Sequence, residues 1–177
     1  GQGSGRRGRS WVSPVAANLY LSLLRGFVGG LQCTGGLSLV MGVAGAEALQ
    51  GLGFTRVGVK WPNDLVVDGS KLGGLLVEGG GEFAGPAKVV VGLGLNVSMP
   101  RSAGGGITQS YTDLATLAGG PVSRNRVAAA VLEHLLIALE TFERDGLTAF
   151  LDRYASLDVL AGREVMIEEG GAVHAGI

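Results

Sequence analysis

Apolar and polar residues alternate with a period of two at 18–24, which predicts a strand with one apolar and one polar side. A continuous apolar run at 87–97, interrupted by glycines, predicts a second strand. A third strand is expected at 160–167, followed by a turn at Gly170-Gly171 and a returning run. Strand patterns therefore occur near the start, in the middle and at the end of the chain.

The stretch between residues 57 and 78 predicts a β-ribbon. Residues 57–61 form a strand that Pro62 ends, because proline has no backbone N–H for the ladder. Apolar runs at 65–67 and 72–78 predict the next two strands, joined by a tight turn at Asp68-Gly69.

Helical spacing of apolar residues predicts four helices, at 35–52, 111–118, 123–146 and 147–157. Gly42 and Gly45 would allow the first helix to pack closely on a sheet, despite their propensity cost. Ser123 is a good N-cap for the longest helix, and Gly146 is a good stop signal.

Candidate chemistry is concentrated on the ribbon. The run Lys60-Trp61-Pro62-Asn63-Asp64 is followed, after a short gap, by Lys71-Leu72-Gly73-Gly74. Lysine is a mobile point charge suited to phosphate, and aspartate with asparagine can hold Mg²⁺ through oxygen. The alternative is that the lysines are ordinary solvated strand ends.

Two further segments carry unusual composition. Residues 1–11 interleave glycine with arginine, which predicts either an unstructured tail that could bind RNA or a loop that orders around an anion. Gly92-Leu93-Gly94 interrupts the apolar strand before Asn96. Glycines inside a strand mark either a bulge or a place where another group needs room.

Composition narrows the class of protein. The chain has 177 residues, 33 glycines, 16% charged residues and a formal net charge of −1. That charge argues against a generally cationic nucleic-acid binder, and no apolar run approaches the length that spans a bilayer, so no membrane partner is expected. The single Cys33 agrees with a reducing compartment, and a cytoplasmic location is expected.

Three motifs together resemble the biotin protein ligases, which activate biotin with ATP and form an amide bond between it and a carrier lysine. They are Gly3, Gly5, Arg6, Gly8, Arg9 and Trp11 in the arginine-rich loop, the Lys-Trp-Pro-Asn-Asp and Lys-Leu-Gly-Gly-Leu-Leu-Val-Glu runs, and Gly-Leu-Gly-Leu-Asn at 92–96. Ser4 departs from the pattern, since the family usually has arginine there.

The resemblance implies an α+β fold (an α/β sandwich), with a mixed sheet like that of class II aminoacyl-tRNA synthetases, flanked by helices. It also implies a catalytic domain at 1–158 and the start of an SH3-like barrel at 159–177, in a chain truncated at both ends. A helix-turn-helix domain further upstream, present in some family members, would be needed for DNA binding.

The resemblance also assigns site residues. Lys71 and Arg6 are expected to be catalytic, Lys71 between the biotin carbonyl and the α-phosphate and Arg6 closing over the adenylate. The biotin-binding set is Gly3, Ser4, Gly5, Arg6, Lys71, Gly74, Gly92 and Gly94. The ATP-binding set is Arg9, Trp11, Lys60, Asn63, Asp64, Asn96 and Tyr111, and the metal ligands are Asp64 and Asn63, for Mg²⁺.

The implied partners are ATP, Mg²⁺, biotin and the biotin carboxyl carrier protein of acetyl-CoA carboxylase, with a homodimer possible. Two other functions stay open at this point. A lipoate ligase shares the fold class, and competition between the two acids would separate them. A non-catalytic nucleic-acid or repressor module would instead bind in a strongly salt-dependent way without ATP turnover.

Overall fold

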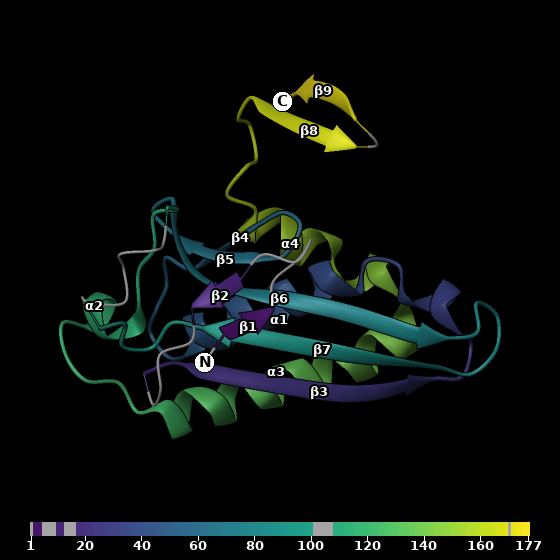
Figure 1. Ribbon diagram of the computed structural model, residues 1–177, viewed down its shortest axis with the longest axis horizontal. Helices are drawn as coiled ribbons and strands as arrows, with labels where there is room; N and C mark the ends of the chain where they lie inside the picture. The colour runs from purple at the N-terminus through teal and green to yellow at the C-terminus, as the bar shows by residue number, and fades with distance from the viewer. Residues whose placement is uncertain (1, 5–9, 13–16, 101–107, 170) are drawn as a thin grey trace.

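Five antiparallel strands form the main sheet of the protein, in the order β3-β7-β6-β5-β4. The computed structural model describes residues 2–4, 10–12, 17–100, 108–169 and 171–177. The strands are β3 (Leu19–Phe27), β4 (Gly58–Lys60), β5 (Asp64–Val67), β6 (Ser70–Gly81) and β7 (Ala87–Leu95). Hairpin connections join β4 to β5, β5 to β6 and β6 to β7. Strand β3 pairs with β7 and forms one edge of the sheet (Figure 1).

The predicted α+β class is confirmed, with one difference in the sheet. A mixed sheet was expected, but every pair of strands in it is antiparallel. Short turns reverse the chain from β4 through to β7, and the distant β3 also runs antiparallel to β7. Among the described residues, parallel pairing occurs only as isolated bridges, Val59 with Asp158 and Lys71 with Tyr111.

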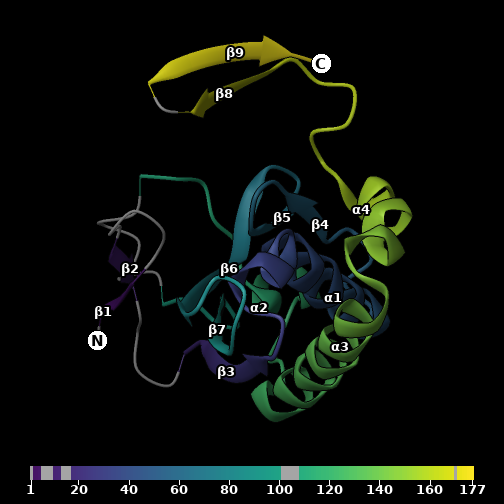
Figure 2. The same cartoon turned by 90° about the vertical axis from the view of Figure 1, so that its right-hand side faces the viewer.

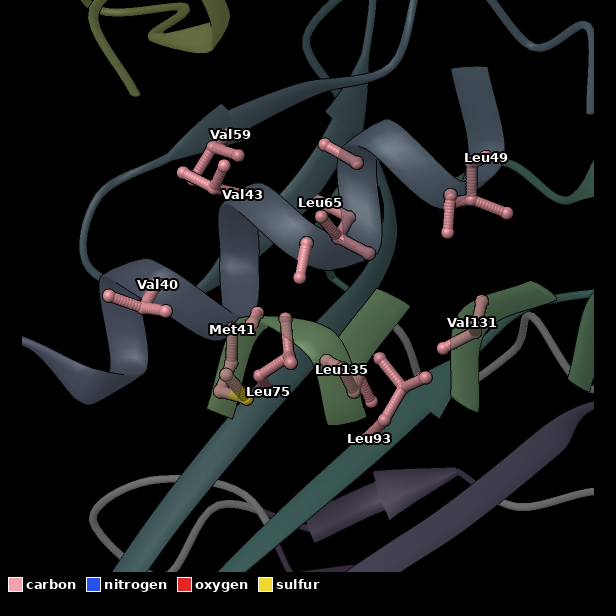
Figure 3. Close-up of a cluster of buried hydrophobic side chains, with 14 of the residues drawn as sticks. Val40, Met41, Val43, Leu49, Val59, Leu65, Leu75, Leu93, Val131 and Leu135 are labelled. Carbon is pink, nitrogen blue, oxygen red and sulfur yellow. The ribbon is translucent and has the colours of Figure 1, made fainter. Parts of the chain in front are cut away.

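Helices α1 (Leu37–Gly51) and α3 (Arg124–Asp145) cover one face of the sheet, as Figure 2 shows edge-on. The hydrophobic core lies between these layers, where Met41 of α1 and Leu135 of α3 meet Leu75 and Leu93 of the sheet (Figure 3). Gly42 and Gly45 face β4 and β5. A Cβ on Gly42 would lie 3.3 Å from a Val59 methyl, so glycine brings α1 close to the sheet, as the sequence predicted.

Helix α3 matches its prediction at both ends. The Ser123 side chain accepts a hydrogen bond from the Arg126 N–H, and Gly146 ends the helix at φ 71°. Apolar residues at helical spacing, from Val127 to Phe142, are buried, and Phe142 packs edge-on against Phe27 of β3 with ring centroids 6.5 Å apart. Helix and sheet are thus fixed to each other by side chains that the periodicity identifies.

Three predicted elements differ at their starts. The helix expected at 111–118 is α2 (Leu114–Ala118), because Asp113 caps it by accepting from the Thr116 N–H, while Tyr111 stays extended. The helix expected at 147–157 begins as the 3₁₀ turn η4 (Leu147–Phe150) and continues as α4 (Leu151–Leu157). The strand expected from residue 160 begins at Val165.

Two small hairpins stand outside the main sheet. Strands β1 (Gln2–Ser4) and β2 (Ser10–Val12) pair with each other, and so do β8 (Val165–Glu169) and β9 (Ala172–Gly176). A further 3₁₀ turn, η2 (Leu31–Thr34), precedes α1. Figure 1 shows β8 and β9 away from the sheet, after the segment that follows α4. The prediction of a separate domain at 159–177 stays a prediction.

Candidate active site

A single row of residues crosses all five strands on the face of the sheet that points away from α1 and α3. The register pairs Tyr20 with Gly94, Gly94 with Gly74, Gly74 with Asp64, and Asp64 with Lys60. Directly paired residues of antiparallel strands project to the same side. Four predicted site residues from separate parts of the chain therefore share one face, here called the outer face.

The next row of the outer face is formed by Ser22, Gly92 and Leu76. The register is uninterrupted at Gly92 and Gly94, so the alternative interpretation that these glycines form a bulge is wrong. A Cβ on Gly92 would meet nothing closer than 3.6 Å, which is ordinary contact. The fold itself therefore does not require glycine at this position.

Lys71 reaches the outer face because of a β-bulge. Leu65 pairs with Gly73 and Val66 pairs with Lys71, so Leu72 is an extra residue in β6. Leu72 is fully buried in the core, as are its neighbours on the helix side. With uninterrupted alternation Lys71 would share the helix side with Gly73 and Leu75, so the bulge is what directs its side chain outward.

Lys71 Nζ lies 2.7 Å from Asp64 Oδ1, and the two side chains are only 21% and 20% exposed. A Cβ on Gly74 would lie 3.2 Å from that same Asp64 oxygen and 3.4 Å from Lys71 Cε, so this ion pair lies over Gly74. A sheltered cation beside a carboxylate and a side-chain-free patch of sheet suits an anionic ligand with a flat portion.

The backbone of Lys71 is held by a segment distant in sequence. Its N–H donates to Ser110 O at 2.9 Å, and its carbonyl accepts from the Thr112 N–H at 2.9 Å. Tyr111 is thereby placed beside Lys71, although its helix assignment was wrong. These two bonds hold Tyr111 next to the strand that carries Lys71.

Asn63 is anchored to β6 from both its backbone and its side chain. Its carbonyl accepts from the Leu75 N–H at 2.9 Å, and its amide Nδ2 donates to the Leu75 carbonyl. The amide oxygen is the atom that would serve as a metal ligand. Within the described ranges, no group of three or more His, Cys, Asp or Glu side chains is close enough to hold a metal ion.

Asn96 is buried at the end of β7, and its side chain bonds to protein. Its Nδ2 donates to Thr112 O at 3.1 Å, and its Oδ1 lies 3.4 Å from Asn18 Nδ2. The sequence pointed to a nucleotide contact at Asn96 but missed Asn18 and Thr112. A polar residue directly before an apolar strand is the signal that could have drawn attention to Asn18.

The arginine-rich loop is described in part. Gly5, Arg6 and Arg9 lie outside the described residues, whereas Gly3 and Ser4 belong to β1 and pair with Trp11 and Ser10 of β2. Figures 1 and 2 show this hairpin on the outer-face side of the sheet. Both strands of this hairpin thus lie on the side that carries the row with Gly74 and Gly94.

A sequence model of the biotin/lipoate A/B protein ligase family matches residues 1–96. The chain belongs to this family. Its resemblance to biotin protein ligases, noted from the motifs, agrees with the relatives. It is 43% identical over 165 residues to the bifunctional ligase/repressor BirA of Escherichia coli, covering 93% of this chain and 51% of that protein.

Other family members extend the agreement. The biotin–[acetyl-CoA-carboxylase] ligase of Mycobacterium tuberculosis is 35% identical over 137 residues, which are 75% of this chain and 48% of that protein. The biotin protein ligase of Aquifex aeolicus, solved in complex with biotin and ATP, superposes with a TM-score of 0.80 at 29% identity and covers 98% of this chain and 71% of its own.

This family member spans about half the length of the curated relatives it matches. None of the helices in its described part has the length and apolar character needed to cross a bilayer.

Proposed function

We propose that this chain is the catalytic part of an ATP-dependent biotin protein ligase. The observation that carries the proposal is the Lys71–Asp64 pair, held over Gly74 on the outer face, in a chain of this family. In the first step the biotin carboxylate attacks the α-phosphorus of ATP and pyrophosphate leaves, giving biotinyl-AMP. In the second step a carrier lysine amine attacks the anhydride carbonyl, AMP leaves, and the amine loses a proton.

Lys71 is proposed to supply the positive charge that the first step needs. Biotin and ATP are both anions, and negative charge grows on the α-phosphate as the new bond forms. A cation whose backbone is fixed on both sides needs little reorganisation at that moment. Arg6 is proposed to close over the adenylate and exclude water, which slows hydrolysis of the anhydride.

The biotin ring is proposed to lie on two adjacent glycine rows of the outer face, one with Gly74 and Gly94 and the next with Gly92. Their support is the space over Gly92 and the sharing of one face by Gly74 and Gly94. Gly3, Ser4, Gly5 and Arg6 would cover the ring from the arginine-rich loop. This arrangement removes water from both faces of a flat, weakly polar ligand.

The nucleotide is proposed to lie on the far side of Lys71 from Gly92 and Gly94, with Tyr111 against adenine. Arg9, Trp11, Lys60 and Asn96 complete the set, Lys60 supporting the phosphates. Lys60 is the cross-strand neighbour of Asp64, so two lysines flank that carboxylate. Because Asn96 already bonds to Thr112, its contribution to ATP binding is proposed to be placement of the Tyr111 segment.

Asp64 and Asn63 are proposed to hold Mg²⁺ when ATP is bound. Mg²⁺ usually takes one or two protein carboxylates together with phosphate oxygens. Asp64 offers its carboxylate next to Lys71, and the neighbouring Asn63 offers its amide oxygen. When bound, the ion would neutralise phosphate charge. The residues themselves orient the phosphates and keep Lys71 near the reacting carboxylate.

The acceptor is proposed to be the biotin carboxyl carrier protein of acetyl-CoA carboxylase, since the names of two relatives state that carboxylase. The proposed compartment is the cytoplasm. DNA binding through an upstream segment is part of the proposal only by analogy with family members named ligase/repressor. A homodimer is proposed from the family resemblance alone.

A lipoate ligase is the second candidate, because the matching family includes both kinds of enzyme. Biotin-dependent exchange of labelled pyrophosphate into ATP tests the two together. Exchange that depends on biotin and resists excess lipoate is expected. Exchange driven by lipoate would replace the proposal, and no exchange with either acid, in folded protein, would remove it.

A further inference from the structure

Three polar side chains are buried among the described residues, and all three lie at one end of the sheet. They are Asn18, Asn96 and Asp113, at 6%, 5% and 7% exposure. A buried polar group that loses its partner is costly, so such groups fix the geometry around them. Their common location next to the proposed nucleotide site suggests a role beyond stability.

Asn18 fixes the end of β7. Its Oδ1 accepts from the Val97 N–H at 3.0 Å, and the neighbouring Ala17 carbonyl accepts from the Ser98 N–H at 3.0 Å. Its Nδ2 has Met99 Sδ at 2.9 Å, the Tyr20 hydroxyl at 3.3 Å and Asn96 Oδ1 at 3.4 Å. The residues just before β3 therefore hold the backbone of Val97 and Ser98 and the side chain of Asn96, all directly after β7.

From Asn96 the connection continues to Lys71. The Asn96 N–H donates to Leu72 O at 2.9 Å, and its Nδ2 donates to Thr112 O at 3.1 Å. The Thr112 N–H in turn donates to Lys71 O at 2.9 Å. Thr112 is thus held on one side by Asn96 and on the other by Lys71.

Asp113 completes the anchor. Its two carboxylate oxygens accept from the Met99 N–H at 2.8 Å and the Thr116 N–H at 2.7 Å. The segment after β7 and the segment before α2 are therefore joined at both Thr112 and Asp113.

We infer that Asn18 is a positioning residue for the nucleotide end of the site. It orients Asn96, which through Thr112 keeps the Ser110–Thr112 segment, and with it Tyr111, beside Lys71. The inference rests on the proposed function, because it takes Tyr111 to lie on the ATP side. It predicts that loss of the Asn18 amide weakens ATP use more than biotin use, since β3 and β6 still hold Gly92 and Gly94 by pairing with β7 on both sides.

The test compares Asn18→Ala with Gln50→Ala in biotin-dependent pyrophosphate exchange. Gln50 is a matched control, because its side-chain amide also bonds to the backbone: its Nε2 donates to Val57 O at 2.8 Å, but from α1 on the helix side. Removing about one hydrogen bond of positioning predicts an ATP KM raised about five- to tenfold for Asn18→Ala, with the biotin KM nearly unchanged. Gln50→Ala is expected to lower the unfolding midpoint without shifting either KM selectively.

An unchanged ATP KM in Asn18→Ala, or equal rises in both KM values, would overturn the inference. If Asn18→Ala does not fold, Thr112→Pro removes the N–H that bonds Lys71 O and leaves the buried amides in place. The same selective rise in ATP KM is expected, and its absence overturns the inference. Absence of biotin-dependent exchange in the unmodified chain would instead count against the proposed function.

Discussion

Lys71 Nζ and Asp64 Oδ1 lie 2.7 Å apart on the outer face, although their strands pair through a bulge. The pair joins the two halves of the lysine motif: Asp64 follows the strand that Lys60 ends, and Lys71 follows the hairpin turn at Asp68-Gly69. A cation fixed in this way is available to a substrate without a search through many rotamers. Substitution of either member of the pair should therefore impair the reaction.

Replacing Lys71 with alanine should abolish most biotin adenylation. Loss of one preorganised charge at the reacting phosphate predicts a fall in exchange rate of about 100-fold or more. Lys88→Ala is the control, because Lys88 is an exposed lysine of β7 on the same face. It pairs with Gly26 and Gly80, far along the strands from Lys71. Near-normal exchange in Lys71→Ala would remove this residue from the mechanism.

Asp64→Asn should weaken the reaction in a way that added Mg²⁺ partly restores. The substitution keeps the shape but removes the negative charge that holds Lys71 and would share the metal, so about a tenfold rise in the Mg²⁺ needed for half-maximal exchange is expected. Asp68→Asn is the control, since Asp68 pairs with exposed Arg56 at the turn of the same ribbon. An identical Mg²⁺ dependence in the two variants would contradict the metal assignment.

Gly92→Ala should leave the fold intact and impair biotin binding. Its Cβ would meet only Leu76 atoms at 3.6 and 3.9 Å, so the unfolding midpoint is expected to stay close to that of the unmodified chain. The methyl group would occupy the proposed biotin floor, so the biotin KM should rise by about tenfold or more, since overpacking a ligand site costs upward of ~1 kcal/mol. Gly80→Ala, with nothing within 4 Å of its Cβ on the same face, should change neither quantity.

Tyr154 provides a pH prediction away from the site. Burial, with a contribution from Asp158, raises the pKa of Tyr154 to about 12. In this range the unfolded chain loses the phenol proton first, so the native state binds more protons and its stability falls as pH rises from about 10 toward 12. Absorbance titration at 295 nm should show a late tyrosine phase that Tyr154→Phe removes; retention of that phase would assign it to another residue.

Local sequence determined several elements of this protein. Helix α3 could be placed from Ser123 to Gly146, since its capping and its apolar period act within a few residues along the chain. The hairpin at Asp68-Gly69 was equally predictable, because Asp-Gly favours tight turns in which both central residues have positive φ. Both residues adopt positive φ in the observed turn. The family could also be identified from short motifs whose residues are adjacent in sequence.

Tertiary structure decided how those motifs meet. The row from Tyr20 to Lys60 depends on strand order and register, which arise from the packing of distant strands on a shared core. The bulge at Leu72 sends Lys71 outward because burying Leu72 outweighs one regular ladder step, and no local pattern shows that balance. The bonds from Asn18 through Asn96 to Thr112 likewise exist only once three loops are buried together, where unpaired amides would be costly.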